Sequence, residues 1–333
     1  MDLDVLFIGT AGSAPSARRA LPATLIRRGG DRLLVDCGEG TQRQLLRSVG
    51  LVELDEIFVT HFHADHFLGL PGMLKTYSLR GRETPLTVYG PPGLKALFAA
   101  LRPVVGRTAF DLRLVELEPN EVLRRDGYRI AAFAVDHGVT AYGYALVEEP
   151  RPGRFDEARA RELGVVPGPD FGRLQRGEAV SGADGVVVPP EEVLGPPRRG
   201  RKVVLAGDTT PFDTTRVAAH EADLLVHEAT FLEEEAERAR ETGHSTARGA
   251  AELAAAAEVR LLALTHVSPR YAGGELRDEA RAVFERTIVP RDLDRVEVPF
   301  PERGSPVHVR ADGPRRAGRE ASPADIAPSG GGP

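Results

Sequence analysis

The hexapeptide His61-Phe62-His63-Ala64-Asp65-His66 constrains this chain more than any other segment. It places three imidazoles and a carboxylate within six residues, directly after the apolar run EIFVT at residues 56–60. In an extended backbone, side chains two residues apart point the same way, so His61 and His63 can bind one metal ion. The chain then turns into the helix-compatible residues 67–79, which lets Asp65 and His66 face a neighbouring ion. The hexapeptide therefore predicts a centre for two metal ions.

Six residues cannot complete two coordination spheres, so further ligands must come from distant segments. His137 in FAVDHGV, Asp208 in VVLAGDTT and His266 in LLALTHVS each stand at the end of an apolar run. We expect one ion to be bound by His61, His63 and His137, the other by Asp65, His66 and His266, and Asp208 to bridge them. Nitrogen and oxygen ligands without thiolate fit zinc best, with manganese or iron as alternatives.

Two zinc ions at such a site favour hydrolysis as the chemistry. A pair of ions can share a hydroxide and can stabilise both the attacking and the leaving oxygen of a displacement. Asp65 is then placed to orient or deprotonate the attacking water.

Several short apolar runs that end in polar residues are predicted to be strands, because they are brief and rich in β-branched residues. These runs cover residues 5–9, 33–40, 56–61, 203–209, 224–230 and 261–268. Helical patterns at residues 232–241 and 246–257 lie between them. The alternation predicts a layered α/β fold with functional residues at the carboxyl ends of strands.

The chain is predicted to form one body over residues 1–310. Between about residues 150 and 200, Pro and Gly are too frequent for core strands or long helices, which indicates an insertion that projects from the body or a long surface loop. Residues 311–333 have one large apolar residue and are expected to be a disordered tail.

The charge pattern limits the kinds of partner. A formal net charge of -6 argues against indiscriminate binding to nucleic acid. Residues 75–107, however, carry six basic residues and one acid, which suits either a polyanion docked in one orientation or an unevenly charged surface. Cys37 is the only cysteine, which excludes intramolecular disulfides. Without a signal sequence or a long apolar run, we expect a cytoplasmic protein that does not bind membranes.

The hexapeptide has the form HxHxDH and resembles the hallmark motif of the metallo-β-lactamase superfamily. The resemblance implies an αββα sandwich, which is an α/β (α+β) fold. Residues 1–310 further resemble the ribonuclease Z family in FIGTAGSAPS, in DCGEGTQRQLL at residues 36–46, and in the pair His227-Glu228-Ala229-Thr230 and His244-Ser245-Thr246. This similarity implies a homodimeric endonuclease that removes 3′ trailers from precursor tRNA and leaves a 3′-hydroxyl.

The resemblance gives Glu228 and His244 a catalytic role. Glu228 is expected to orient His244, which would stabilise or protonate the leaving 3′ oxygen. A carboxylate-backed imidazole can supply both charge and a proton near neutral pH. Without the family resemblance, His244 is equally consistent with a surface residue or a cap residue before the helix predicted at residues 246–257. Ser245 and Thr246 are further candidates for the cap.

Residues 153–178 resemble the protruding arm with which the family holds the tRNA elbow. The stretch carries acids as well as five arginines, which are Arg154, Arg159, Arg161, Arg173 and Arg176.

One loop departs from the family pattern. Where many members read PxKxRN, residues 15–20 keep the proline and Arg19 but lose the lysine and the asparagine, and Arg18 is a candidate replacement for the lysine. The change leaves open whether a CCA end blocks cleavage. Two alternatives also stay open: a related hydrolase acting on a small phosphodiester, sulfate ester or lactone, and a binding module without chemistry.

Overall fold

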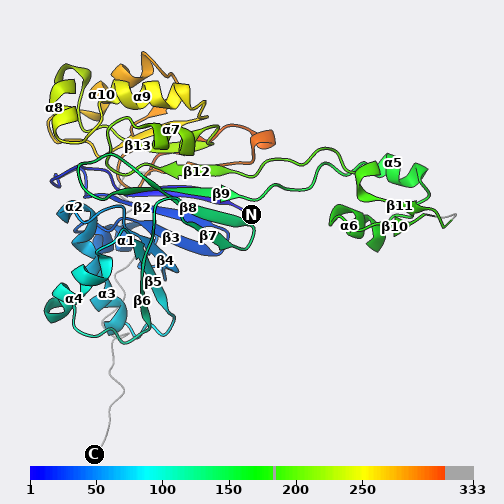
Figure 1. The fold of residues 1–333 in the computed structure, drawn as a ribbon, viewed down its shortest axis with the longest axis horizontal. Helices are drawn as coiled ribbons and strands as arrows, with labels where there is room; N and C mark the ends of the chain where they lie inside the picture. The colour runs from blue at the N-terminus through cyan, green and yellow to red at the C-terminus, as the bar shows by residue number, and fades with distance from the viewer. Residues whose placement is uncertain (183–184, 312–333) are drawn as a thin grey trace, which may run out of the picture.

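Two β-sheets packed face to face form the centre of the molecule, and helices cover the outer face of each sheet (Figure 1). The computed structural model describes residues 1–182 and 185–311. The four layers confirm the predicted αββα sandwich. The predicted disordered tail, apart from Ala311, lies outside the described residues.

The first sheet combines antiparallel and parallel pairs. In spatial order, its strands are β17 (Val307–Val309), β16 (Arg295–Glu297), β1 (Leu3–Gly9), β2 (Ala23–Arg28), β3 (Asp31–Val35), β4 (Glu56–Phe58), β5 (Leu86–Gly90) and β6 (Leu112–Glu116). Its outer face is covered by α1 (Thr41–Ser48), α2 (Ala64–Phe67), α3 (Gly69–Leu79) and α4 (Leu94–Val105).

The second sheet contains three neighbouring parallel pairs and an antiparallel half. Its strands are β15 (Thr287–Ile288), β14 (Leu262–Thr265), β13 (Leu224–Glu228), β12 (Lys202–Leu205), β9 (Tyr142–Glu148), β8 (Tyr128–Ala134) and β7 (Val122–Arg125). On its outer side lie α7 (Asp213–Ala219), η2 (Glu233–Glu235), α8 (Ala236–Glu241), α9 (Ala247–Ala256) and α10 (Gly273–Arg281). No helix in the described ranges has the length and hydropathy to cross a membrane.

Strand β13 illustrates why the layers form. Leu224 and Val226 contribute to the core between the two sheets, whereas Leu225 packs in the core beneath the helices. Successive strand residues point to opposite faces, so a strand covered on both faces is apolar along most of its length, as β13 is before His227 and Glu228. This double burial explains the unbroken apolar run in the sequence.

The segment between β9 and β12 projects far from both sheets (Figure 1). Residues 154–194, here called the arm, contain α5 (Glu157–Glu162), α6 (Pro169–Gln175), β10 (Val180–Ser181), β11 (Val187–Val188) and η1 (Pro190–Glu192). The arm has its own apolar cluster, which comprises Ala160, Val165, Leu174, Val180, Val188 and Val193. Residues 149–153 and 195–201, called the stalks, connect it to the body.

Candidate metal centre

The predicted ligands meet at one edge of the sandwich, because strands from both sheets end there. Asp208 follows β12, His266 follows β14, and both strands run parallel to β13. His61 follows β4 of the other sheet, and the rest of the hexapeptide leads into α2. His137 follows β8. The structure thus brings all seven predicted metal ligands into one cluster.

Three imidazole nitrogens form the first candidate ligand set. His61 Nε2 lies 2.9 Å from His63 Nδ1, and His137 Nε2 lies 3.2 Å from the same Nδ1. Two nitrogens bound tetrahedrally to one zinc at about 2.0–2.1 Å would be about 3.3 Å apart. The spacing therefore fits three ligands that share one ion.

Asp65, His66 and His266 form the second set. Asp65 Oδ2 lies 3.3 Å from His266 Nε2 and 3.6 Å from His66 Nε2. The His66 Nε2 atom is buried and, apart from the ion-pair contact with Asp208 Oδ2 at 3.2 Å, has no hydrogen-bond partner within the described chain. A buried polar atom without a partner is costly, and a cation would satisfy it.

Asp208 lies between the two sets. Its Oδ2 is 3.1 Å from His266 Nε2 and 3.2 Å from His66 Nε2. The same oxygen is 3.8 Å from His137 Nε2 and 4.0 Å from His61 Nε2. One carboxylate oxygen therefore reaches toward ligands of both sets, which is the position a bridging ligand requires.

The protonation states suit a cation. Burial, reinforced by the nearby His66, lowers the pKa of His61 to about 2, so this ring is neutral and keeps a free lone pair. Burial alone would raise the pKa of Asp208, but the charges of His266 and His66 outweigh it and hold the pKa well below its usual value. The neutral His61 ring and the ionised Asp208 carboxylate are the protonation states that a divalent metal requires. Burial opposes protonation of His66, but the charges of Asp208 and Asp36 raise its pKa well above its usual value, so this ring would release a proton on binding a metal.

A second layer of hydrogen bonds orients the rings. Asp36 Oδ2 contacts His66 Nδ1 at 2.8 Å, and Thr60 Oγ1 contacts His61 Nδ1 at 3.0 Å. Thr230 Oγ1 contacts His266 Nδ1 at 2.8 Å, and the Gly243 carbonyl contacts His137 Nδ1 at 2.7 Å. Occupying Nδ1 in this way leaves Nε2 of each ring for a metal. Sequence reasoning assigned no role to these four residues.

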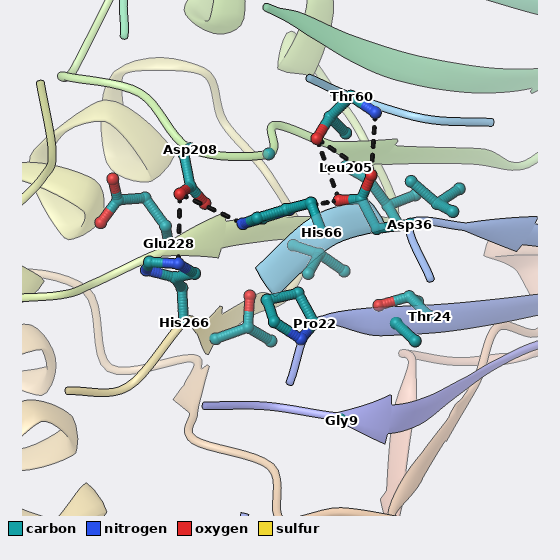
Figure 2. A pocket seen from close by; sticks show the side chains of 15 residues that line it. Gly9, Pro22, Thr24, Asp36, Thr60, His66, Leu205, Asp208, Glu228 and His266 are labelled. Carbon is teal, nitrogen blue, oxygen red and sulfur yellow. Dashed lines mark hydrogen bonds and ion pairs between the residues drawn. The ribbon is translucent and has the colours of Figure 1, made fainter. Parts of the chain in front are cut away.

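Figure 2 shows a small cavity that extends from the ligands into the space between the sheets. His66, Asp208 and His266 line it at the ligand end, and Asp36 and Thr24 line it deeper inside. Its volume of about 40 Å³ exceeds what one water molecule needs. The ligands thus border a small cavity that both polar and apolar side chains line.

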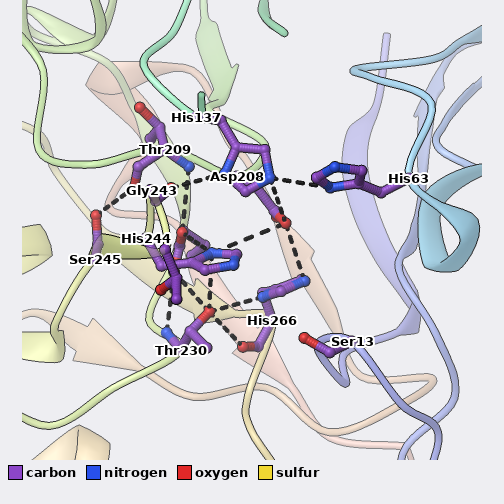
Figure 3. Close-up of polar contacts among 12 residues, drawn as sticks. Ser13, His63, His137, Asp208, Thr209, Thr230, Gly243, His244, Ser245 and His266 are labelled. Atoms are coloured by element: carbon purple, nitrogen blue, oxygen red, sulfur yellow. Dashed lines mark hydrogen bonds and ion pairs between the residues drawn. The ribbon is translucent and has the colours of Figure 1, made fainter. Parts of the chain in front are cut away.

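Glu228 and His244 form a pair that adjoins this cluster. Figure 3 shows His244 between His137 and His266. His244 Nδ1 lies 2.6 Å from Glu228 Oε1. Glu228 also accepts hydrogen bonds from the backbone N–H groups of Thr209 and Thr230 and from the Thr230 hydroxyl. With its oxygens occupied in this way, Glu228 acts as a support for His244.

The pair is charged at neutral pH. Burial opposes protonation of His244, but the charge of Glu228 and the hydrogen bond between them raise its pKa to about 9. His244 also lies at the start of α9, yet the cap of that helix is Thr246, whose hydroxyl accepts from the Gly249 N–H at 2.9 Å. The capping role that the sequence allowed for Thr246 is confirmed.

Close backbone packing holds the loop of residues 11–20 against the site. The Ser13 N–H donates to Asp65 Oδ2 at 2.9 Å, and a Cβ at Gly12 would come within 2.4 Å of His266 Nδ1. Ser13 and His266 both have positive φ, of 60° and 55°. Non-glycine residues in this region carry backbone strain, which often marks functional sites.

The two arginines of this loop differ in orientation. Arg19 donates to Thr10 Oγ1 at 2.6 Å and to the Pro290 carbonyl at 2.8 Å, so its side chain fixes the loop to the body. Arg18 is exposed and lines a cavity of about 550 Å³ together with Arg43 and Arg47 of α1.

Comparison with known proteins identifies the class to which this fold and site belong. The model of the metallo-β-lactamase superfamily matches residues 19–266, a span that begins in the Arg19 loop and ends at the candidate ligand His266. The chain is thus a metallo-β-lactamase-fold protein.

Close relatives narrow the class to one family. Ribonuclease Z of Haloferax volcanii is 48% identical over 90% of this chain and 96% of its own length. Ribonuclease Z of Gemmatimonas aurantiaca is 47% identical over 91% of this chain and 98% of its own. The crystal structure of the short form of human tRNase Z, 27% identical, covers 89% of this chain and 99% of its own, with a TM-score of 0.65. The chain belongs to the ribonuclease Z family, and the expectation of an enzyme of this family is confirmed.

The supporting role of Asp36 is testable by the variant Asp36→Asn. Asparagine also tolerates positive φ, here 59°, but its amide is a weaker acceptor for the His66 N–H. We expect metal affinity to fall about 10- to 100-fold, measured by elemental analysis after titration with a chelator. Glu39→Gln, an exposed position in the same loop, serves as control, and equal metal retention in both variants would contradict the role of Asp36.

Proposed function

We propose that this enzyme is a zinc-dependent endoribonuclease that removes the 3′ trailer from precursor tRNA and leaves a 3′-hydroxyl on the tRNA. The observation that carries the proposal is the Glu228–His244 pair next to two adjoining ligand sets. Relatives that bear the name ribonuclease Z over nine tenths of the chain support the choice of substrate.

Two zinc ions are proposed, one held by each ligand set, with Asp208 as the bridge. When bound, they would supply positive charge to the scissile phosphate and acidity to the attacking water. Asp65 has a second task in this proposal, since its carboxylate is ionised at neutral pH and can accept a proton from the water or orient it.

His244 is proposed to act on the leaving group. As water attacks phosphorus, the bond to the 3′ oxygen breaks, and the His244 imidazolium gives that oxygen a proton through Nε2. Glu228, bonded to Nδ1, holds the ring in place and favours its charged form. The products are a tRNA that ends in a 3′-hydroxyl and a trailer that begins with a 5′-phosphate.

The arm is proposed to hold the tRNA away from the site of cleavage. In the structure, four of its five arginines pair with acids of the arm itself, and Arg154 makes no side-chain ion pair within the described residues. Such exposed pairs are weak and exchange readily for phosphate contacts. Binding of tRNA by the arm should therefore weaken as salt concentration rises.

The exposed Arg18 is proposed to take the place of the missing lysine of the Pro15–Ala20 loop and to contact nucleotides beyond the cleavage site. The cytoplasmic location and the homodimer stay predictions.

A precursor tRNA with a 3′ trailer tests the proposal directly. We expect cleavage that stops when a chelator removes the metal, returns with added zinc, and leaves a tRNA end that accepts ligation as a 3′-hydroxyl. Elemental analysis should give about two zinc ions per chain. Cleavage by a demonstrably metal-free protein, or a product ending in a 3′-phosphate, would exclude this mechanism.

The role of His244 predicts a selective kinetic defect. His244→Ala should lower kcat about 10²- to 10⁴-fold while changing KM by less than about threefold, because the proton is needed in the transition state. His220→Ala, at an exposed position, should leave both constants unchanged. A large rise in KM with an intact kcat would assign His244 to binding instead.

Deleting the arm tests whether the substrate is precursor tRNA or a small phosphodiester. The backbones of Gly153 and Gly195 touch at the arm's base, so residues 154–194 can be removed and these glycines joined. The body should still fold, because the arm has a core of its own. We expect loss of precursor tRNA cleavage with hydrolysis of a chromogenic phosphodiester retained. Equal loss of both activities would count against an RNA-holding arm.

A further inference from the structure

The stalks that carry the arm have little regular backbone pairing. One isolated antiparallel bridge joins Arg151 to Arg198, with N–O distances of 2.8 and 2.9 Å, and a second bridge, between Phe155 and Leu194, lies beyond the stalks at the base of the arm. Proline has no N–H to donate and cannot extend a ladder. Four prolines stand in the stalks, at positions 150, 152, 196 and 197. Backbone hydrogen bonds between the stalks are therefore too few to fix the direction of the arm.

Side chains from the chain's C-terminal part contact the stalks instead. They come from Phe300 and from η3 (Pro301–Arg303) directly after it, in the segment that connects β16 to β17 of the first sheet. Glu302 accepts from Arg151 Nη2 through both carboxylate oxygens, at 2.9 and 3.0 Å. Arg198 of the other stalk reaches the same carboxylate at 3.2 Å. One acid thus joins both stalks to the edge of the first sheet.

Phe300 supplies the second half of this contact. The guanidinium carbon of Arg151 lies 3.4 Å from the centre of its ring, and that of Arg201 lies 4.1 Å away. Cations over an aromatic ring are attracted by its quadrupole, more strongly when they are partly desolvated. The ring therefore contacts Arg201 at the body end of one stalk and Arg151 in the other stalk.

The Arg201 end of this contact is rigid. Its guanidinium is buried and makes two hydrogen bonds of 2.7 Å to Glu148, the last residue of β9. It also donates to the Val298 carbonyl at 3.0 Å. Phe300 thus packs on a charge that hydrogen bonds fix to β9 and to the residue after β16, so the ring has a fixed position against which Arg151 packs.

We propose that Phe300 and Glu302 form an arm anchor, which sets the direction of the arm relative to the metal centre and so positions precursor tRNA for cleavage. The anchor rests on the proposed function, because it matters for the reaction only if the arm holds the substrate. Phe300 and Glu302 are positioning residues. They act through Arg151 and Arg198 and are remote in the sequence from every predicted ligand.

The direction of the arm can be measured without activity. Cys37 is fully buried, and burial raises the pKa of its thiol to about 12, so introduced cysteines at exposed positions can be labelled selectively. Val166→Cys on the arm and Val217→Cys on α7 are both well exposed. With a nitroxide on each, pulsed electron paramagnetic resonance reports the distribution of distances between arm and body.

We expect a narrow distribution in the labelled parent and a clearly broader one when Phe300→Ala and Glu302→Gln are combined. The same double variant should raise KM for precursor tRNA about three- to tenfold, since a freer arm must be ordered on binding. Its kcat, its metal content and its hydrolysis of a small phosphodiester should stay unchanged. Phe300→Tyr combined with native Glu302 keeps the ring face and should behave as the parent.

Glu297→Gln removes a neighbouring exposed acid that pairs with Arg295, and as the matched control it should change nothing. An unchanged distance distribution in the double variant overturns the anchor. A broadened distribution with an unchanged KM overturns its role in positioning substrate. Equal loss of both hydrolytic activities would mean general damage and also refute the positioning role. If the parent itself fails to cleave precursor tRNA, the proposed function fails, and the distance distribution alone still decides whether the anchor fixes the arm.

Discussion

Burying a carboxylate among several imidazoles costs free energy unless positive charge shares the space, and this constraint governs the site of the present chain. Asp208 is almost wholly inaccessible and lies within 4.0 Å of imidazole nitrogens from both ligand sets. Protons on the rings can compensate the charge in part. Divalent cations would do so fully and would also use the lone pairs of neutral rings such as His61, so charge compensation and the proposed catalysis call for the same occupant.

The sandwich makes this arrangement possible because strands from two sheets end at a common edge. Four of the candidate ligands, His61, His137, Asp208 and His266, follow short strands, so packing on the faces of the sheets sets their backbone positions, and Asp65 and His66 lie in α2. The second layer then fixes the rings. Asp36, itself directly after β3, joins Thr60 and His66 through one carboxylate, which connects ligands of both candidate ions through a shared partner.

The layered α/β fold and the convergence of the seven candidate ligands were predictable from local signals in the sequence, whereas the αββα sandwich followed from the family resemblance. A strand ends where an apolar run meets a polar residue, and His137, Asp208 and His266 all stand at such points. Asp36 stands at one as well, so the same signal was available for it. The hydroxyls of Thr60 and Thr230 gave no signal, since their roles depend on rings that only the fold brings near. The sequence also could not predict that the Arg19 side chain points into the body, because one of its acceptors is the carbonyl of Pro290, which is distant in sequence.

The separate core of the arm has a consequence for how this protein opens in solution. Six small or medium-sized apolar residues form that core, with Phe155, Leu163 and Phe171 packed against it, and among the described residues none of this cluster belongs to the clusters of the body. The free energy of opening should therefore differ between the two regions, with the arm as a foldon of low stability beside a body that opens only globally. Amide hydrogens of α5 and α6 would then exchange with solvent while those of β12 and β13 remain protected, so the ligands keep their geometry through each local unfolding event.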